Sequence, residues 1–279
     1  MNKQKLTDKL RNEATKRNVD FNTLRRLYMY DRFIERLSLS KYNDNFVLKG
    51  GFYLSTLYGV ESRSTMDIDT AFRNASFDKE TITDMINSVI AIDINDDAIV
   101  KLVKIDDIRE EDEYGGFRVN IEVNIDGSKE SFHIDIATGD PITPKSIKFK
   151  YRPTLSDKFI NVNAYNIETV LAEKIETVLS RAEANSRMRD FYDIYLIYTR
   201  DWDNINKSHF RKAMENTFKD RGFKGDIQET FEIIEESSIL ENKWNQYARR
   251  NVYCKSLKYK ELIKIIDIII EEIQVVIIH

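Results

Sequence analysis

The sequence predicts an α+β domain over residues 1–150, followed by an all-helical domain over residues 151–279. Segments in which apolar residues alternate, the pattern of half-buried strands, occur in the first part of the chain. From Asn166 onward, apolar residues recur with the period of a helix. The boundary is marked by the three prolines, which are Pro141, Pro144 and Pro153. Strands grouped before helices are typical of an α+β architecture.

The first domain is expected to begin with helices over residues 1–40 and to continue as a sheet. Strands are predicted at Phe46–Leu48, Thr65–Phe72, Ala98–Ile105, Gly116–Ile125 and Ser131–Ile136. Asp126-Gly127 predicts a hairpin turn between the last two strands. One helix is expected from Phe52 to Tyr58, and a second from Asp78 to Ile90 with Asp78 as its N-cap.

Composition excludes several classes of protein. The 279 residues include 43 Lys and Arg against 47 Asp and Glu, so the chain is not basic all over, as a non-specific nucleic-acid coat would be. One cysteine and three separated histidines exclude a disulfide framework and disfavour a metal site built from histidine. Between Glu80 and Glu113 there are eleven acidic and three basic residues, a net charge of −8. Because the whole chain has a net charge of −4, the remaining residues carry +4. Any polyanion is therefore expected to bind outside this acidic stretch.

No segment resembles a signal peptide or a membrane span. Met1–Asp20 contains no apolar run, and the apolar tail Leu262–Ile278 is interrupted by Lys264, Asp267, Glu271 and Glu272. The tail is predicted to be a buried or partner-covered helix, because charges in hydrocarbon are costly. We expect a cytoplasmic protein with no membrane partner.

Three short motifs carry candidate chemistry. In Lys49-Gly50-Gly51, the glycines precede a helix, where backbone N–H groups and the helix dipole favour a phosphate; a purely structural turn is the alternative. In Asp67-Ile68-Asp69, the two carboxylates share one face of a strand and are the hard oxygen ligands that Mg²⁺ prefers; a solvated edge strand is the alternative.

The third motif is Asp135, which lies between apolar neighbours on a later strand. A carboxylate in such a strand needs a metal or another partner, and a capping or turn role is equally compatible with the sequence.

Taken together, these motifs resemble the nucleotidyltransferases of the DNA polymerase β-like superfamily. The match is closer to the AbiEii/AbiGii toxin family, and it covers about residues 40 to 200. It rests on Phe46-Val-Leu-Lys-Gly-Gly-Phe-Tyr-Leu, Gly59, Arg63-Ser-Thr-Met-Asp-Ile-Asp, Leu171-Ala-Glu-Lys174, Arg181 and Arg187-Met-Arg-Asp190-Phe-Tyr-Asp193-Ile-Tyr.

The resemblance implies a polymerase-β-like core followed by a helical domain. It also implies a toxin of type IV toxin–antitoxin or abortive phage infection systems, whose relatives transfer nucleotides to the acceptor end of tRNA. The implied partners are an NTP, either GTP or CTP, tRNA, and an antitoxin or transcriptional repressor encoded nearby.

The resemblance further implies roles for individual residues. Asp67 and Asp69 hold Mg²⁺ or Mn²⁺, with Asp135 as a candidate third carboxylate that activates the attacking hydroxyl. The residues that contact nucleotide phosphates are Lys49, Gly50, Gly51, Arg63, Ser64 and Lys174. Asp190 completes the site. From the residues alone, three ion pairs are alternatives: Lys174 with Glu173 or Glu176, Asp190 with Arg187, and Arg63 with Glu61.

An RNA acceptor requires a basic surface. The candidates crowd the stretch between the two domains and are Lys145, Lys148, Lys150, Arg152 and Lys158, with the rings of Phe149 and Tyr151 available for stacking on bases. A charged edge strand is the alternative. A second basic cluster comprises Lys207, Arg211, Lys212, Lys219, Arg221 and Lys224.

Two other functions compete with nucleotidyl transfer to RNA. One is a module that binds GTP or another NTP without transferring it, and the other is a nucleotidyltransferase that modifies a small molecule. The basic stretch is the feature that favours RNA over a small acceptor.

Overall fold

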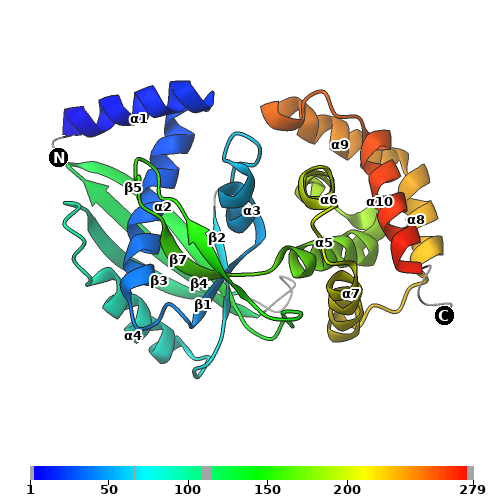
Figure 1. The fold of residues 1–279 in the computed structure, drawn as a ribbon, viewed down its shortest axis with the longest axis horizontal. Helices are drawn as coiled ribbons and strands as arrows, with labels where there is room; N and C mark the ends of the chain where they lie inside the picture. Colours follow the sequence, from blue (N-terminus) through cyan, green and yellow to red (C-terminus); the bar gives the residue numbers. More distant parts are fainter. Residues whose placement is uncertain (1–2, 66, 109–114, 275–279) are drawn as a thin grey trace. The chain divides into compact units, whose positions relative to one another are not determined.

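The computed structural model describes residues 3–65, 67–108 and 115–274. The chain forms two compact units (Figure 1). The first comprises Met1–Gly139 with Ser146–Tyr165, and the second comprises Asp140–Lys145 with Asn166–His279. Met66, residues 109–113 of the acidic stretch and residues 275–278 of the apolar tail, all used in the sequence analysis, lie outside the described residues.

A seven-stranded sheet with the order β3-β4-β5-β2-β1-β7-β6 forms the first unit. Its strands are β1 (Phe46–Lys49), β2 (Ile68–Phe72), β3 (Ile99–Ile108), β4 (Gly116–Ile125), β5 (Ser128–Ala137), β6 (Ile147–Tyr151) and β7 (Ile160–Ala164). The pairs β2–β5 and β1–β7 are parallel, and the other neighbouring pairs are antiparallel. Strands distant in sequence thus become neighbours at the centre of the sheet.

The helices of the first unit are α1 (Lys3–Arg17), α2 (Phe21–Leu39), α3 (Gly50–Tyr58) and α4 (Lys79–Ile90). Of these, α2, α3 and α4 pack on the sheet and α1 packs on α2. The ring of Tyr30 on α2 lies 4.5 Å from that of Phe132 on β5, and Phe52 on α3 lies 6.2 Å from Tyr151 on β6. Asp78 caps α4 as predicted, by accepting the Thr81 amide proton at 2.8 Å.

Polar residues of the same strands share the opposite face. Side chains alternate along a strand, and residues paired in register point to the same side. Lys49 pairs with Asp69, Asp69 with Asp135, and Asp135 with Arg118. The register therefore brings charged residues from four strands into one row, on the face opposite Ile68 and Ile134, which are fully buried.

The second unit is helical, as expected. Its helices are α5 (Ile167–Arg181), α6 (Met188–Asp201), α7 (Lys207–Arg221), α8 (Ile227–Glu236), α9 (Ser238–Arg250) and α10 (Tyr259–Gln274), with short 3₁₀ turns η1 (Ala182–Ala184) and η2 (Val252–Cys254). The core includes Trp244 and Phe210, and α10 contributes Leu262 and Ile269, all with no exposed surface. The described part of the apolar tail is thus a helix whose apolar side is buried while Lys264 and Glu271 are exposed. None of the helices in the described ranges has the length and apolarity needed to cross a membrane.

The boundary between the units differs from the expected one. Residue 150 lies within β6, whereas the first unit extends through β7 to Tyr165. The physical reason is that β7 pairs with the central strand β1, a contact that alternation within β7 does not reveal. The edge position of β6 agrees with the alternative of a charged edge strand.

Candidate active site

The turn from β1 into α3 brings a carboxylate against the first of its two glycines. Gly50 has φ +60°, a left-handed conformation that side chains disfavour. A Cβ atom on Gly50 would lie 2.5 Å from Asp69 Oδ2, so only glycine leaves room for this carboxylate. The first backbone N–H groups of α3 lack helical partners and are suited to an anion.

Arg63 lies beside the second glycine. A Cβ atom on Gly51 would lie 2.7 Å from Arg63 Nη2 and 3.2 Å from Thr65 Oγ1. The Arg63 side chain is buried and donates a hydrogen bond from Nη1 to the carbonyl oxygen of Ser64. A guanidinium next to a helix N-terminus gives this corner of the first unit a positive potential suited to phosphate.

The carboxylate of Asp67 is held by a histidine that the sequence analysis did not single out. His133 Nε2 lies 2.9 Å from Asp67 Oδ1, and about a third of each side chain is exposed. The contact follows from the parallel register, in which Ile68 pairs with Ile134, so the residues preceding each of them are neighbours. The only signal in the sequence is that His133 and Asp135 alternate on the same strand.

Asp135 is engaged by Arg118, which the sequence analysis also missed. Arg118 Nε donates to Asp135 Oδ1 at 2.8 Å and Nη2 to Oδ2 at 2.7 Å, a bidentate pair across β4 and β5. In the described ranges, no group of three His, Cys, Asp or Glu side chains is placed to hold a metal ion. A third ligand from Asp135 would therefore require Arg118 to release it.

The carboxylates of the first unit nevertheless suit a divalent cation. Asp67 and Asp69 flank Ile68 and share a face, and Mg²⁺ is commonly held by one or two carboxylates together with substrate phosphates. The glycine turn that receives Asp69 is also the one that presents the amides of α3. The carboxylates of Asp67 and Asp69 would thus fit as ligands of a divalent cation that also binds a substrate phosphate.

A second group of charges lies within the helical unit. Lys174 on α5 donates to Asp190 on α6, and its Nζ lies 3.2 Å from Asp193 Oδ2; Arg187 Nε donates to Asp190 Oδ2 at 3.1 Å. Both carboxylates are buried. Burial by itself lowers the pKa of Lys174, but the two carboxylates outweigh it, and the pKa lies above its ordinary value.

The structure thus sorts the predicted site residues into two sets. Lys49, Gly50, Gly51, Arg63, Ser64, Asp67, Asp69 and Asp135 belong to the first unit, and Lys174 and Asp190 to the second. The alternative partners of Lys174 pair with Arg221 instead: Glu176 Oε2 lies 2.8 Å from Arg221 Nη1, and Glu173 Oε1 lies 3.6 Å from Arg221 Nη2. The alternative of an Asp190–Arg187 pair is correct and coexists with the pair to Lys174.

The aromatic rings of the basic stretch are packed against other side chains and, contrary to the expectation, are not placed to stack on bases. Tyr151 is buried and donates its hydroxyl to Asp31, while the ring of Phe149 packs 5.3 Å from that of Tyr53. The prediction that Tyr151 stacks on bases is therefore wrong, because β6 turns this ring toward the apolar face. Within the first unit, Lys148 pairs with Asp44 at 2.5 Å, and Arg152 pairs with Asp157 at 3.0 Å.

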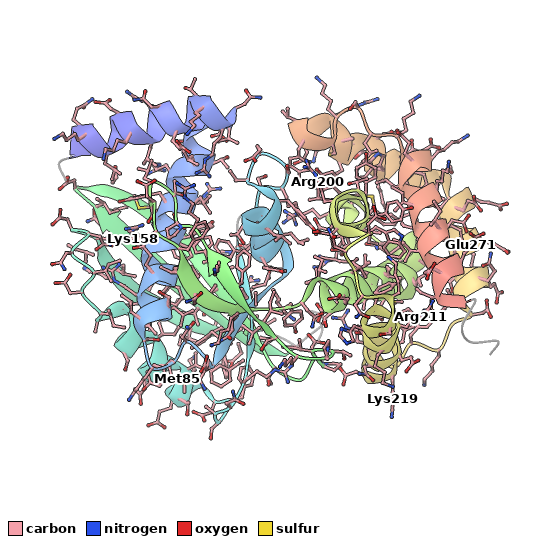
Figure 2. All side chains as sticks on the ribbon, in the orientation of Figure 1. Met85, Lys158, Arg200, Arg211, Lys219 and Glu271 are labelled. Carbon is pink, nitrogen blue, oxygen red and sulfur yellow. The ribbon has the colours of Figure 1, made fainter. Side chains whose placement is uncertain are left out.

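The remaining basic residues divide between the units. Lys150 is exposed on β6, whereas Lys145 belongs to the second unit, where its carbonyl oxygen accepts from Asn166. Lys158 carries a label in the first unit and Lys219 in the second (Figure 2).

A mixed sheet that sets a carboxylate against a glycine turn at a helix N-terminus is the arrangement expected of a nucleotidyltransferase. The family described as nucleotidyl transferase AbiEii toxin, of type IV toxin–antitoxin systems, matches residues 32–264. The chain belongs to this family and is a toxin nucleotidyltransferase, which confirms the resemblance seen in the motifs. No curated protein matches the chain.

One solved structure shows the same fold, and a second is similar to this chain with a lower TM-score. MenT4, a nucleotidyltransferase toxin from Mycobacterium tuberculosis, is 14% identical with a TM-score of 0.54, and the match covers 91% of this chain and 93% of MenT4. JHP933 from Helicobacter pylori is 15% identical with a TM-score of 0.49, over 91% of this chain and 94% of JHP933. At this identity, the likeness to MenT4 establishes the architecture and not the substrate.

Proposed function

We propose that this toxin transfers a nucleoside monophosphate from an NTP to an RNA acceptor, the 3′ end of tRNA, and thereby blocks translation and growth. The single observation that supports it most is the contact of Asp69 with the Gly50 turn. That contact supports the proposal because Asp69, the proposed metal ligand, lies next to the turn whose amides would receive the triphosphate. GTP and CTP are the proposed donors, and the cytoplasm is the proposed location.

In the reaction, an acceptor hydroxyl oxygen bonds to the α-phosphorus, the bond to the β-phosphate breaks, and pyrophosphate leaves. Asp67 and Asp69 would hold the Mg²⁺ or Mn²⁺, which when bound lowers the pKa of the hydroxyl and neutralises charge on the phosphates. The α3 amides and Arg63 bind phosphate oxygens, and Lys49 and Ser64 are candidates for further contacts.

Three further residues complete the proposal. Asp135 remains the candidate to accept the proton from the attacking hydroxyl, with Arg118 beside it. Lys174 and Asp190 are proposed, on family resemblance, to contact the triphosphate and to complete the site. Their mutual pair within the second unit is compatible with a cation presented in a fixed position.

The test is transfer of label to RNA. Purified protein is incubated with Mg²⁺, total tRNA and each of the four NTPs labelled at the α-phosphate, and the RNA is separated on a gel. The wild type should label tRNA, and Asp69→Asn should not, whereas Asp84→Asn, at an exposed carboxylate on α4, should behave as wild type. Absence of label with the wild type, or equal label with Asp69→Asn, contradicts the proposal.

The same preparation distinguishes the competing functions. Calorimetric binding of an NTP without label on any RNA would favour a binding module, and label on a small molecule would favour a small-molecule nucleotidyltransferase. The toxin class implies a cognate antitoxin. Induction with and without that antitoxin, followed by phage challenge, tests growth arrest and antiviral defence.

A further inference from the structure

Phe159 is the exposed aromatic residue of the first unit. Its side chain is 60% exposed, directly before β7, and no other Phe, Tyr or Trp in the described ranges is exposed to this degree. A single exposed ring needs no special explanation. Its surroundings are what make Phe159 informative.

The β6–β7 pair places this ring among cations. Lys148 pairs with Asn163 and Lys150 with Asn161, so their side chains share one face, while Tyr151 and Ile160 point to the other. Arg152 follows Tyr151, and Phe159 precedes Ile160, so by alternation their side chains share the face of the two lysines. Both residues are exposed.

That face is also the face of the candidate active site. Asn163 pairs with Val47 on β1, two residues before Lys49, and Lys49 pairs with Asp69 on β2. Even-numbered steps along β1 keep the same side of the sheet, so the lysines of β6 and the carboxylate of Asp69 share it. Three strand spacings separate β6 from β2, which is about 14 Å.

The charge on this edge suits a polyanion. Lys148, Lys150, Arg152 and Lys158 contribute four positive charges, and the paired carboxylates Asp44 and Asp157 contribute two negative ones. An excess of positive charge beside an exposed ring is typical of surfaces that bind single-stranded nucleic acid, in which the ring stacks on a base and the cations contact phosphates.

We propose that the β6–β7 edge binds the single-stranded end of the acceptor RNA, with Phe159 stacked on a base and Lys150 on an adjacent phosphate. The single-stranded RNA would then cross the polar face of the sheet toward Asp69. This inference rests on the proposed function, because it assumes that the acceptor is RNA. It replaces Tyr151 by Phe159 as the stacking residue.

The test uses binding and turnover together. Affinity of the full chain for a fluorescein-labelled single-stranded oligoribonucleotide is measured by anisotropy for wild type, Phe159→Ala, Phe159→Leu, Phe159→Tyr and Lys150→Gln. Phe159→Ala and Phe159→Leu should bind roughly tenfold more weakly and raise the KM for RNA without changing the KM for NTP, while Phe159→Tyr should bind as wild type. Lys150→Gln should reduce the slope of log affinity against log salt by about 0.7, and Phe159→Ala should not change that slope.

Leu39→Ala is the matched control, because Leu39 is 67% exposed in the same unit but lies on α2. Unchanged RNA affinity in Phe159→Ala overturns the proposal, as does wild-type affinity in Phe159→Leu, which would indicate an apolar contact and not stacking. Loss of toxicity in Phe159→Ala with RNA affinity intact would assign the ring to a protein partner and also overturn it. Failure of the proposed function is distinct, since it appears as absence of RNA labelling by the wild type.

Discussion

The orientation of Asp67 depends on a neighbouring strand, since His133 donates to one of its two carboxylate oxygens. Residues that orient a metal ligand commonly affect metal affinity and activity almost as strongly as the ligand itself. His133 is thus the residue at which the proposed metal site can be tested indirectly.

We expect His133→Ala to lower Mn²⁺ affinity and turnover by about 10- to 100-fold. His133→Gln can still donate to Asp67 and should recover part of the loss. Metal affinity is measured by calorimetry and turnover by labelling. His209→Ala, at an exposed histidine of the second unit, should match wild type, and equal metal affinity in His133→Ala and wild type would contradict the role.

At the scale of elements, the turn between β1 and α3 depends on one glycine. Gly50 and Gly127 both have positive φ, but a Cβ atom would meet Asp69 at Gly50 and nothing within 4 Å at Gly127. Substitution by Ala at either position should cost about 1–2 kcal/mol of folding free energy.

Activity should separate the two glycine variants. Gly50→Ala displaces Asp69 and should abolish labelling of RNA, while Gly127→Ala should retain it. Chemical denaturation and the labelling reaction measure both effects. Retained activity in a folded Gly50→Ala protein would show that the Asp69 contact is dispensable.

Helix α2 is joined to the β6–β7 connection through a buried carboxylate. Asp31 accepts the Tyr151 hydroxyl and the Thr154 amide, the latter at 2.6 Å, and burial raises the pKa of Asp31 above its ordinary 3.8. Its contribution to stability is therefore fully present below pH 3.8 and is lost as the pH rises through the higher folded value.

The substitution Asp31→Asn keeps the shape of the side chain but removes its negative charge. Relative to wild type, the variant should gain stability as the pH rises from 4 to 7.5, since only the wild type must bury a charge there. Urea denaturation at both pH values measures the difference. A variant that loses stability relative to wild type over this range would show that the ionised carboxylate is favoured in the fold.

Comparison of particular elements shows what the sequence could predict. Alternation within β4 and the cap of α4 are local, so Gly116–Ile125 and Asp78 were predicted correctly. The partners Arg118 and His133 were missed because they depend on cross-strand register, and the parallel pairing of β2 with β5 has no local signature. The roles of the site residues stay predictions until activity is measured.

At the scale of the whole molecule, each unit contains its own buried charges. In the second unit, Lys174 pairs with Asp190 and Asp193, whose side chains are 2% and 0% exposed, and Arg187 also pairs with Asp190. Removing one partner from such a cluster leaves buried charge uncompensated. Loss of toxicity in a Lys174 variant therefore cannot by itself be assigned to catalysis.

We expect Lys174→Met to destabilise the second unit by about 3–5 kcal/mol. Adding Asp190→Asn to this variant should recover part of the loss, because it removes one uncompensated charge. Thermal unfolding detects the effect, and Lys219→Met on the exposed part of α7 serves as control. A Lys174→Met protein as stable as wild type would assign the residue to substrate contact alone.

The pairing of β1 with β7 also bears on when the toxin can first act during synthesis. Residue 47 pairs with residue 163, and the segment 140–145 between β5 and β6 belongs to the other unit. Contacts between residues so distant in sequence form late and slowly. The pairing of β1 with β7 therefore cannot form until β7 has left the ribosome. A chain truncated before residue 160 should thus be harmless to the cell that makes it.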